Sequence, residues 1–256
     1  MKRIVIKVGS STIAYENGLL NLRKIEELTK IISDLSNQGM EVILVSSGSV
    51  AAGMGKMQMT SAPSTLFNKQ AVAAIGQCEL MYIYDKFFSQ FGKIVGQMLM
   101  TKRVVVDSTL RENATNTLET LLQYRSIPII NENDSVATEE LVYGDNDTLG
   151  AITAQLINAE MLIVLSDIDG LYDKNPSCYP DAKLIPIVEK VTKEIEDMAE
   201  DTTNKVGTGG MITKLAAAKI ATSAGCDMVI CNSKDLNVIY DVIENKKVGT
   251  LFKKEV

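Results

Sequence analysis

Short apolar segments alternate with longer amphipathic segments along almost the whole chain of 256 residues. The short segments are rich in Val and Ile, whose branched side chains suit a sheet, and the longer ones repeat apolar residues with helical spacing. Strands are predicted at residues 4–8, 40–45, 93–100, 127–130, 161–165, 183–188 and 227–231. Helices are predicted at residues 22–38, 65–91, 108–124, 148–158, 192–199, 211–224 and 236–243. Such alternation is typical of an α/β sandwich with a mostly parallel sheet, and no linker interrupts it, so we expect one domain, 1–256.

The composition restricts where such a protein works and what it binds. Hydrophobic residues make up 46% of the chain, but no apolar run approaches the roughly 20 residues that a membrane-spanning helix needs. The N-terminus also lacks the apolar region of a signal peptide, so we expect a cytoplasmic protein without membrane contacts. The net charge of −6 argues against nucleic acid as a partner, because binding a phosphate backbone requires a basic surface.

Cysteine and histidine usage excludes several kinds of site. The four cysteines are scattered and form no Cys-x-x-Cys motif, so neither a zinc site nor a disulfide framework is predicted. The chain contains no histidine. A Ser-His-Asp triad, a phosphohistidine and a His-ligated metal are therefore excluded, and carboxylates or lysines would have to carry any acid–base chemistry.

Lys7 is the one charged residue in the first predicted strand, and Gly9 follows it closely. An ammonium group beside a buried strand loses hydration unless it meets an anion, and the N–H groups of a glycine-containing turn can bind the same anion. Alternatively, Lys7 extends its ammonium group from the strand edge into water. This segment alone fits a phosphate site and a strand-edge lysine equally well.

Polar or glycine-rich clusters follow the predicted strands, or the loops behind them, at residues 46–49, 131–134, 144–147, 166–167 and 207–210. A hairpin-like polar segment, 135–143, is expected between the second and third clusters. Ligands of parallel α/β sheets bind beyond the carboxyl ends of the strands, so these clusters could line one crevice. Cluster 207–210 precedes a predicted helix that carries Lys214 in its first turn, which suits a phosphate.

Neither glycine-containing segment is a Walker A loop, and Gly-x-Gly-x-x-Gly does not follow the first strand. Each cluster taken alone could be an ordinary turn or a surface loop. Two dense Asn/Asp clusters together favour a site for a polar ligand.

The motifs taken together resemble the amino acid kinase family, and within it the glutamate 5-kinases. They are Lys-Val-Gly-Ser-Ser from Lys7, Ser-Ser-Gly from Ser46, Asn-Glu-Asn-Asp-Ser-Val from Asn131, Gly-Asp-Asn-Asp from Gly144, Ser-Asp-Ile-Asp-Gly-Leu-Tyr from Ser166 and Gly-Thr-Gly-Gly-Met-x-Thr-Lys from Gly207. They span nearly the whole chain in order. The resemblance implies a three-layer αβα sandwich, with an acceptor-binding lobe at about 1–158 and an ATP-binding lobe at about 159–256.

The resemblance also implies a reaction, in which ATP phosphorylates the side-chain carboxylate of L-glutamate to L-glutamyl 5-phosphate at the start of proline biosynthesis. A carboxylate with a pKa near 4.3 is already ionised at neutral pH, so this nucleophile needs no general base. The requirement is instead charge neutralisation and in-line placement of two anions. Magnesium would lie mainly on the ATP phosphates, and no protein metal ligand is expected.

The same resemblance assigns roles to residues. The catalytic residues it implies are Lys7 and Lys214, which would flank the transferred phosphoryl group, and Asp147, which would hold both lysines. The acceptor-binding residues it implies are Ser47, Gly48, Asp134 and Asn146. The nucleotide-binding residues it implies are Lys7, Gly9, Ser166, Asp167, Thr208, Gly209, Gly210, Met211, Ile212, Thr213 and Lys214.

The chain departs from the family pattern in two loops, where Asn175-Pro176 replaces the frequent Asp-Pro and Ser49 replaces the frequent alanine after Ser-Gly. Both are interpreted as loop variation. We expect no C-terminal PUA domain of the RNA-binding type, a homo-oligomer (dimer or tetramer), and L-proline as a feedback inhibitor.

Two alternatives remain. One is a family member that acts on N-acetylglutamate, aspartate, carbamate or UMP, although such acetylglutamate and UMP kinases typically have more glycine in the turn at Gly9. The other is a nucleotide- or amino-acid-sensing module without catalysis, which the presence of Lys7, Asp147 and Lys214 argues against.

Overall fold

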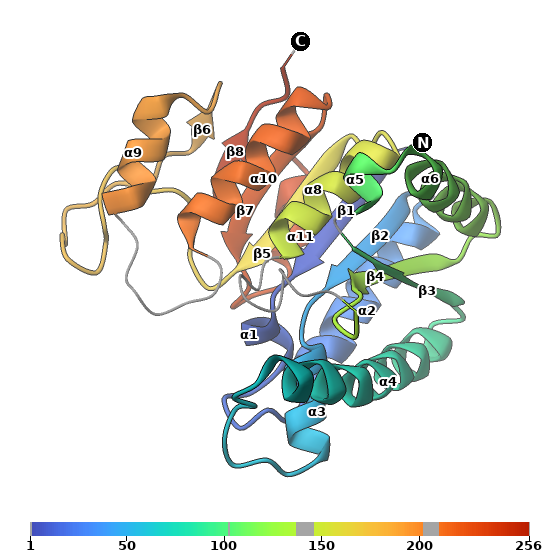
Figure 1. Cartoon of the computed structure of the whole chain (residues 1–256). Coiled ribbons are helices and arrows are strands. Elements are labelled where there is room, and N and C mark those ends of the chain that lie inside the picture. The colour runs from blue at the N-terminus through green and yellow to red at the C-terminus, as the bar shows by residue number, and fades with distance from the viewer. Residues whose placement is uncertain (1, 102, 137–145, 202–209, 256) are drawn as a thin grey trace.

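The computed structural model describes residues 2–101, 103–136, 146–201 and 210–255, and these form a sheet of eight strands in the order β3-β4-β2-β1-β5-β7-β8-β6 (Figure 1). The strands are β1 (Arg3–Val8), β2 (Glu41–Ser46), β3 (Val95–Met100), β4 (Ile127–Glu132), β5 (Met161–Ser166), β6 (Ile187–Val188), β7 (Asp227–Asn232) and β8 (Thr250–Phe252). The five pairings among β1 to β5 and β7 are parallel, whereas β8 runs antiparallel to β7. The predicted α/β fold with a mostly parallel sheet is confirmed.

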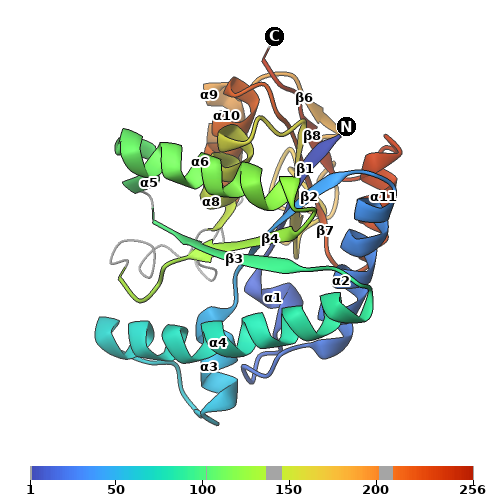
Figure 2. The same ribbon diagram turned by 90° about the vertical axis from the view of Figure 1, so that its right-hand side faces the viewer.

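Helices cover both faces of the sheet and complete three layers (Figure 2). They are α1 (Ser10–Ile13), α2 (Leu22–Asn37), α3 (Ser49–Lys56), α4 (Leu66–Gln90), α5 (Arg103–Val106), α6 (Ser108–Gln123), α8 (Asn146–Leu156), α9 (Lys193–Asp201), α10 (Met211–Ser223) and α11 (Val238–Ile243). Helices α2, α4 and α11 pack on one face, and α6, α8 and α10 on the other.

Side chains of β1 alternate between these two layers, as a pleated strand requires. Ile4, Ile6 and Val8 belong to the hydrophobic core under α2 and α4, and Val5 belongs to the core under α8 and α10. Lys7 has the parity of Val5, so its side chain leaves the sheet on the side of α8 and α10. The alternation of a buried strand therefore places one ammonium group beneath two helices.

Local signals in the sequence explain several helix boundaries. The side chain of Asn21 accepts a hydrogen bond from the N–H of Lys24 at 3.2 Å and caps the start of α2. Gly39 follows the end of α2 with φ +91°, a conformation that favours glycine, as predicted for a C-terminal cap. The predicted helices are confirmed with small shifts at their ends, since α2, α4, α6 and α10 each end one residue earlier than expected.

Four elements of the structure were absent from the prediction: α1, α3, α5 and β8. The sequence of α3 contains Gly53 and Gly55, which are poor helix formers. They are tolerated because other backbone packs closely on them, that of α4 on Gly53 and that of the loop at Gly18 on Gly55. A Cβ atom at Gly53 would lie 2.0 Å from the carbonyl oxygen of Val72. Tertiary packing, which no local pattern reports, therefore overrides the local preference.

The predicted strand at 183–188 was mostly wrong. It is reduced to β6, with an isolated bridge between Tyr172 and Leu184. Most of the expected polar segment 135–143 lies outside the described residues.

The predicted lobe boundary near residue 158 lies between α8 and β5. Strands β1 and β5 pair in parallel across it, with Ile6 opposite Ile163. The sheet is thus continuous between the two sequence halves, and the division into lobes stays a prediction.

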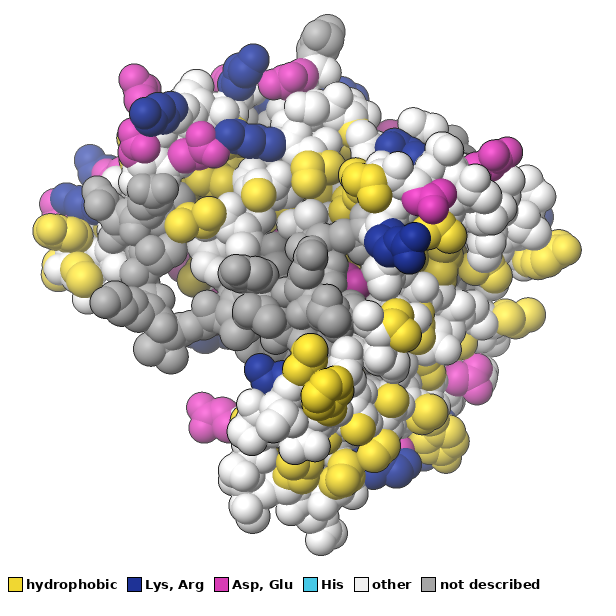
Figure 3. Space-filling model, viewed as in Figure 1, with side chains coloured by type: hydrophobic (Ala, Val, Ile, Leu, Met, Phe, Trp, Pro, Cys, Tyr) yellow, Lys and Arg dark blue, Asp and Glu magenta, His cyan; other side chains and the backbone are white. Residues whose placement is uncertain are grey.

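The part of the chain that the structure describes contains no helix of the length and apolarity needed to cross a bilayer. Acidic and basic side chains are intermixed over α9 and α10, at the upper left of the face in Figure 3. An example is the exposed ion pair between Lys219 and Glu196, which are 2.5 Å apart.

Candidate active site

Three charged side chains from distant parts of the sequence meet under α8 and α10. Lys7 Nζ lies 2.5 Å from Asp147 Oδ1, and Lys214 Nζ lies 3.0 Å from Asp147 Oδ2. All three are buried, with relative exposures of 7% for Lys7, 1% for Asp147 and 6% for Lys214. We call this group the charged trio.

Secondary structure fixes the position of each member of the charged trio. Lys7 lies near the carboxyl end of β1, whereas Asp147 and Lys214 lie in the first turns of α8 and α10. Helix α8 passes close to Lys7, since a Cβ atom at Gly150 would lie 3.5 Å from Lys7 Cβ. Both helix N-termini therefore face the carboxyl end of the sheet, where α/β proteins bind ligands.

The electrostatics of the charged trio favour an anion. Burial raises the pKa of Asp147, but the ammonium groups of Lys7 and Lys214 outweigh this effect and hold the pKa below its ordinary value. Asp147 is thus ionised at neutral pH. Two ammonium groups and one carboxylate carry one net positive charge, so a phosphate oxygen placed beside them gains electrostatic stabilisation.

The residues predicted to bind the acceptor lie together beside the charged trio. Asn146 Nδ2 donates to Ser47 Oγ at 2.9 Å and to the carbonyl oxygen of Ser46 at 3.2 Å. Gly48 begins α3 with φ +103°, and Asp134 Oδ2 accepts a hydrogen bond from Ser49 Oγ at 2.5 Å. The ends of β2 and β4 and the start of α8 therefore contribute polar groups to one place.

The residues predicted to bind the nucleotide are only partly described. Gly9 lies against Lys7, because a Cβ atom at Gly9 would be 3.8 Å from Lys7 Nζ. Ser166 ends β5 beside the end of β1, and its Oγ donates to Asp167 Oδ1 at 3.2 Å. Thr208 and Gly209 lie outside the described residues.

The remaining predicted nucleotide residues form the start of α10. Gly210 is the N-cap and supplies no side-chain hydrogen bond to the helix. Thr213 Oγ1 donates to the carbonyl oxygen of Gly210 at 2.8 Å, which tightens this turn. Met211 is buried and Ile212 is exposed, so only the first of these two side chains packs into the protein.

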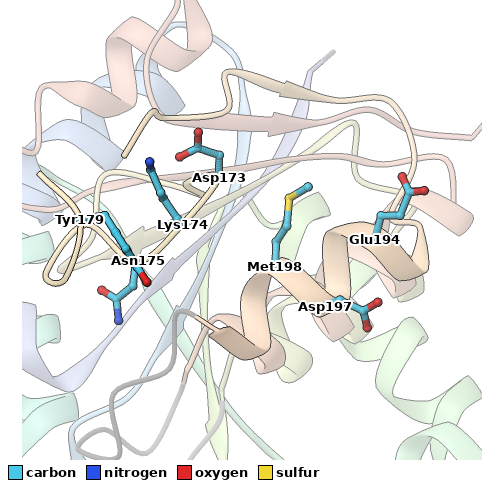
Figure 4. Close-up of a pocket in the computed structure, with 7 residues that line it drawn as sticks. All are labelled: Asp173, Lys174, Asn175, Tyr179, Glu194, Asp197 and Met198. Carbon is cyan, nitrogen blue, oxygen red and sulfur yellow. The ribbon is translucent and has the colours of Figure 1, made fainter. Parts of the chain in front are cut away.

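A cavity of about 660 Å³ lies between the segment that follows β5 and helix α9 (Figure 4). Its lining residues are Asp173, Lys174, Asn175, Tyr179, Glu194, Asp197 and Met198. The segment from β5 contributes four of them and α9 contributes three. This cavity shares no lining residue with the charged trio or with the predicted acceptor residues.

A second cavity, of about 200 Å³, lies between α4 and the ends of β3 and β4. Gln77, Glu132 and Asp134 are among its lining residues, so it borders the predicted acceptor site. Glu132 is buried, with 5% of its surface exposed.

Sequence reasoning gave no role to three residues that the structure places at the site. Ser49, interpreted as loop variation, contacts Asp134 directly, and its position next to Gly48 was the available signal. Asn131 Oδ1 accepts from Asn146 Nδ2 at 2.8 Å, and Asn131 belongs to a recognised motif. Gln77 contacts Asn131 from the middle of α4, where no local pattern distinguishes it.

The fold resembles two solved structures with low sequence identity. UMP kinase from Ureaplasma parvum superposes with a TM-score of 0.65 at 19% identity, covering 99% of each chain. Isopentenyl phosphate kinase from T. acidophilum has a TM-score of 0.67 at 15% identity, covering 98% of this chain and all of that one. At these identities the likeness concerns the fold alone.

Sequence relatives are much more similar. The chain is 48% identical to a glutamate 5-kinase of Clostridium perfringens, covering 98% of this chain and 95% of that protein. It is 51% identical to a glutamate 5-kinase of Listeria innocua and 52% identical to one of Clostridium tetani, covering 98% of this chain and 92% and 94% of theirs. Residues 2–232 match the profile of the amino acid kinase family. The chain therefore belongs to the amino acid kinase family.

Proposed function

We propose that this chain is an ATP-dependent kinase that phosphorylates the side-chain carboxylate of L-glutamate, giving L-glutamyl 5-phosphate for proline biosynthesis. The observation that carries the proposal is the contact pattern of two consecutive residues. Asn146 donates a hydrogen bond to Ser47 Oγ in the predicted acceptor site, and Asp147 forms ion pairs with both lysines of the charged trio. Cations suited to phosphate and polar groups suited to an amino acid thus meet at the start of α8. The high identity to proteins named glutamate 5-kinase supports the same conclusion.

Within this proposal, Lys7 and Lys214 stabilise the charge of the phosphoryl group during transfer. Two anions must approach each other for the reaction, and buried ammonium groups lower the energy of that approach most strongly in the transition state. Asp147 keeps the two ammonium groups close together, so their positions are set before the substrates bind.

The acceptor end of the site must hold an amino acid with one ammonium and two carboxylate groups. Asp134 offers a carboxylate for the ammonium group, and Ser47 offers a hydroxyl donor for a carboxylate. Gly48 offers a backbone N–H beside Ser47. The substrate carboxylate is ionised at neutral pH, which fits a site built by a chain without histidine.

ATP supplies the phosphoryl group, and the residues that we propose to hold it are Lys7, Gly9, Lys214 and the N-terminus of α10. Because the carboxylate of the charged trio is already paired with two lysines, we propose that Mg²⁺ is bound mainly by the ATP phosphates and water.

We also propose that the nucleoside part of ATP occupies the 660 Å³ cavity, since its lining segments follow β5 and precede α10. Tyr179 and Met198 offer apolar surface there. Replacing Tyr179 with Ala should raise KM for ATP and leave KM for glutamate unchanged, whereas an unchanged KM for ATP would remove the cavity from the nucleotide site.

Homo-oligomer formation, inhibition by L-proline and a cytoplasmic location stay predictions. Titrating L-proline into the kinase assay tests the second, and a lack of inhibition at millimolar proline would reject it.

The proposed function is tested by measuring ADP release with ATP and Mg²⁺ against L-glutamate, N-acetylglutamate, L-aspartate and UMP. Glutamate alone should stimulate ADP release, and the product should react with hydroxylamine as an acyl phosphate does. If UMP or N-acetylglutamate stimulated ADP release and glutamate did not, that compound would be the substrate instead of glutamate. If no acceptor stimulated ADP release, the result would favour a sensing module without catalysis.

A further inference from the structure

A chain of side-chain amides runs from α4 into the acceptor site. Gln77 Oε1 accepts a hydrogen bond from Asn131 Nδ2 at 2.8 Å, and Asn131 Oδ1 accepts one from Asn146 Nδ2 at 2.8 Å. Asn146 Nδ2 also lies 2.9 Å from Ser47 Oγ and 3.2 Å from the carbonyl oxygen of Ser46, so its two hydrogens serve three acceptors and one hydrogen is shared. Gln77 and Asn146 are each 9% exposed and Asn131 is 2% exposed, so water competes little for these bonds.

Two backbone groups fix the direction of this chain. The N–H of Glu132 is 2.8 Å from Asn131, and because an N–H can only donate, the atom that faces it must be Oδ1. The carbonyl of Ser46 can only accept, so the Asn146 atom that faces it at 3.2 Å must be Nδ2. Asn131 Nδ2 is therefore left facing α4, where Gln77 must present its oxygen.

This direction sets the hydrogen-bonding character of the acceptor site. Because Asn146 turns its Nδ2 toward Asn131 and Ser47, its Oδ1 lies on the other side of the amide and remains an acceptor. Ser47 Oγ receives a hydrogen from Asn146, so its own hydroxyl hydrogen remains available to donate. An ammonium group and a carboxylate, the two ends of an α-amino acid, match this acceptor and this donor.

Close packing of α4 against α3 brings Gln77 to this position. A Cβ atom at the neighbouring Gly76 would lie 1.8 Å from the carbonyl oxygen of Ser49, so only glycine permits the observed helix separation. Ser49, whose carbonyl Gly76 contacts, also donates its hydroxyl to Asp134 Oδ2. The register of α4 on α3 is thus linked to the geometry of the acceptor residues.

We propose that Gln77 is a positioning residue for the phosphoryl acceptor: it holds Asn131, and through it Asn146 and Ser47, in the orientation that receives the amino acid. This inference rests on the proposed function. Without Gln77 Oε1, the buried side-chain N–H of Asn131 loses its acceptor. The cost of that unpaired group favours other orientations of the Asn131 amide, in which the hydrogen bond to Asn146 is broken.

The test compares Gln77→Met with Gln97→Met. Both glutamines line the 200 Å³ cavity, but Gln97 is an exposed residue of β3 outside the amide chain. Gln77→Met should raise KM for glutamate about tenfold, as expected for the loss of a buried hydrogen bond, with kcat and KM for ATP changed by less than about threefold. Gln97→Met should leave all three constants near the wild-type values.

A double-mutant cycle with Asn131→Ala separates positioning from a structural role. If Gln77 acts through Asn131, the double variant should have the same KM for glutamate as Asn131→Ala alone. Three results would overturn the inference. They are additive effects of the two substitutions on KM for glutamate, an unchanged KM for glutamate in Gln77→Met, and equal increases of KM for glutamate and KM for ATP in that variant.

If Gln77→Met does not fold, side-chain amide NMR of the wild-type protein provides the test. Glutamate should shift the NH₂ signals of Gln77 and Asn131 but not that of Gln97, and an unshifted Gln77 signal would overturn the inference. The assay of the wild-type protein with glutamate is made first and tests the proposed function without any variant. Failure of the proposed function is therefore distinguishable from failure of the role proposed for Gln77.

Discussion

Lys214 on α10 forms a 3.0 Å ion pair with Asp147 on α8, although 67 residues separate them in sequence. Both residues are buried, and both lie in the first turn of their helices. The packing of α8 against α10 on one face of the sheet therefore sets how closely Lys214 approaches Asp147, which also pairs with Lys7.

Asp147→Asn should destabilise the fold at neutral pH. The change leaves two buried ammonium groups without their shared carboxylate, and removing one partner of a buried ion pair typically costs about 3–5 kcal/mol. Urea unfolding at pH 7 measures the loss. Asp181→Asn is the control, since it breaks an exposed pair with Lys174 and should change stability little.

The loss of folding stability in Asp147→Asn should also depend on pH. Burial raises the pKa of Asp147, but both lysines together depress it below its ordinary value, so its ionised form contributes stability that is complete above the ordinary pKa of an aspartate. This contribution is lost as the pH falls through the depressed folded-state pKa. The stability difference between wild type and Asp147→Asn should therefore shrink in that range, and a difference independent of pH would contradict the account.

Asp134→Ala should raise KM for glutamate about 10–100-fold, because a charge-assisted bond to the substrate ammonium is lost. KM for ATP should stay near the wild-type value. Initial-rate kinetics with each substrate varied in turn make the measurement. If KM for ATP changed and KM for glutamate did not, Asp134 would not belong to the acceptor site.

Ser49→Ala should raise KM for glutamate by a smaller factor, about three- to tenfold, since one hydrogen bond that orients Asp134 is removed. Ser135→Ala, which changes the residue after Asp134, should have little effect. The same initial-rate assay distinguishes them. Equal effects of both variants would show that the contact between Ser49 and Asp134 does not matter for binding.

Gly48→Ala should cost more stability than Gly39→Ala. Both glycines have positive φ, +103° and +91°, so both substitutions carry a backbone penalty of about 1–2 kcal/mol. At Gly48 the new Cβ would also lie 2.8 Å from Ile13 Cδ1, whereas at Gly39 it would meet nothing within 4 Å. Urea unfolding compares the two, and a Gly48→Ala loss no larger than that of Gly39→Ala would contradict the packing argument.

The sequence predicts the sheet and most helices because their signals are local. The continuous apolar run of residues 161–165 and the cap at Gly39 can be recognised without knowing the rest of the fold. Helix α3 could not be predicted in this way, because its glycines are favourable only where α4 and the loop at Gly18 pack against them. Strand β8 has three residues, and its antiparallel pairing with β7 has no local signal.

Motifs in the sequence predict which residues belong near the site, but not every contact among them. Lys7, Asp147 and Lys214 were identified through a family resemblance, and the structure adds the 2.5 Å and 3.0 Å distances that join them. Gln77 lies 54 residues from its partner Asn131 in the sequence. A long-range hydrogen bond of this kind depends on the helix packing, so no spacing rule could reveal it.

The central claim is that Lys214 stabilises the phosphoryl group in the transition state, and it is tested most directly by kcat for ADP release in Lys214→Ala. The matched control is Lys219→Ala, which lies on the same helix and removes an exposed ion pair with Glu196. We predict that kcat falls by about a hundredfold or more in Lys214→Ala and stays near the wild-type value in Lys219→Ala. A near-normal kcat in folded Lys214→Ala would contradict the account.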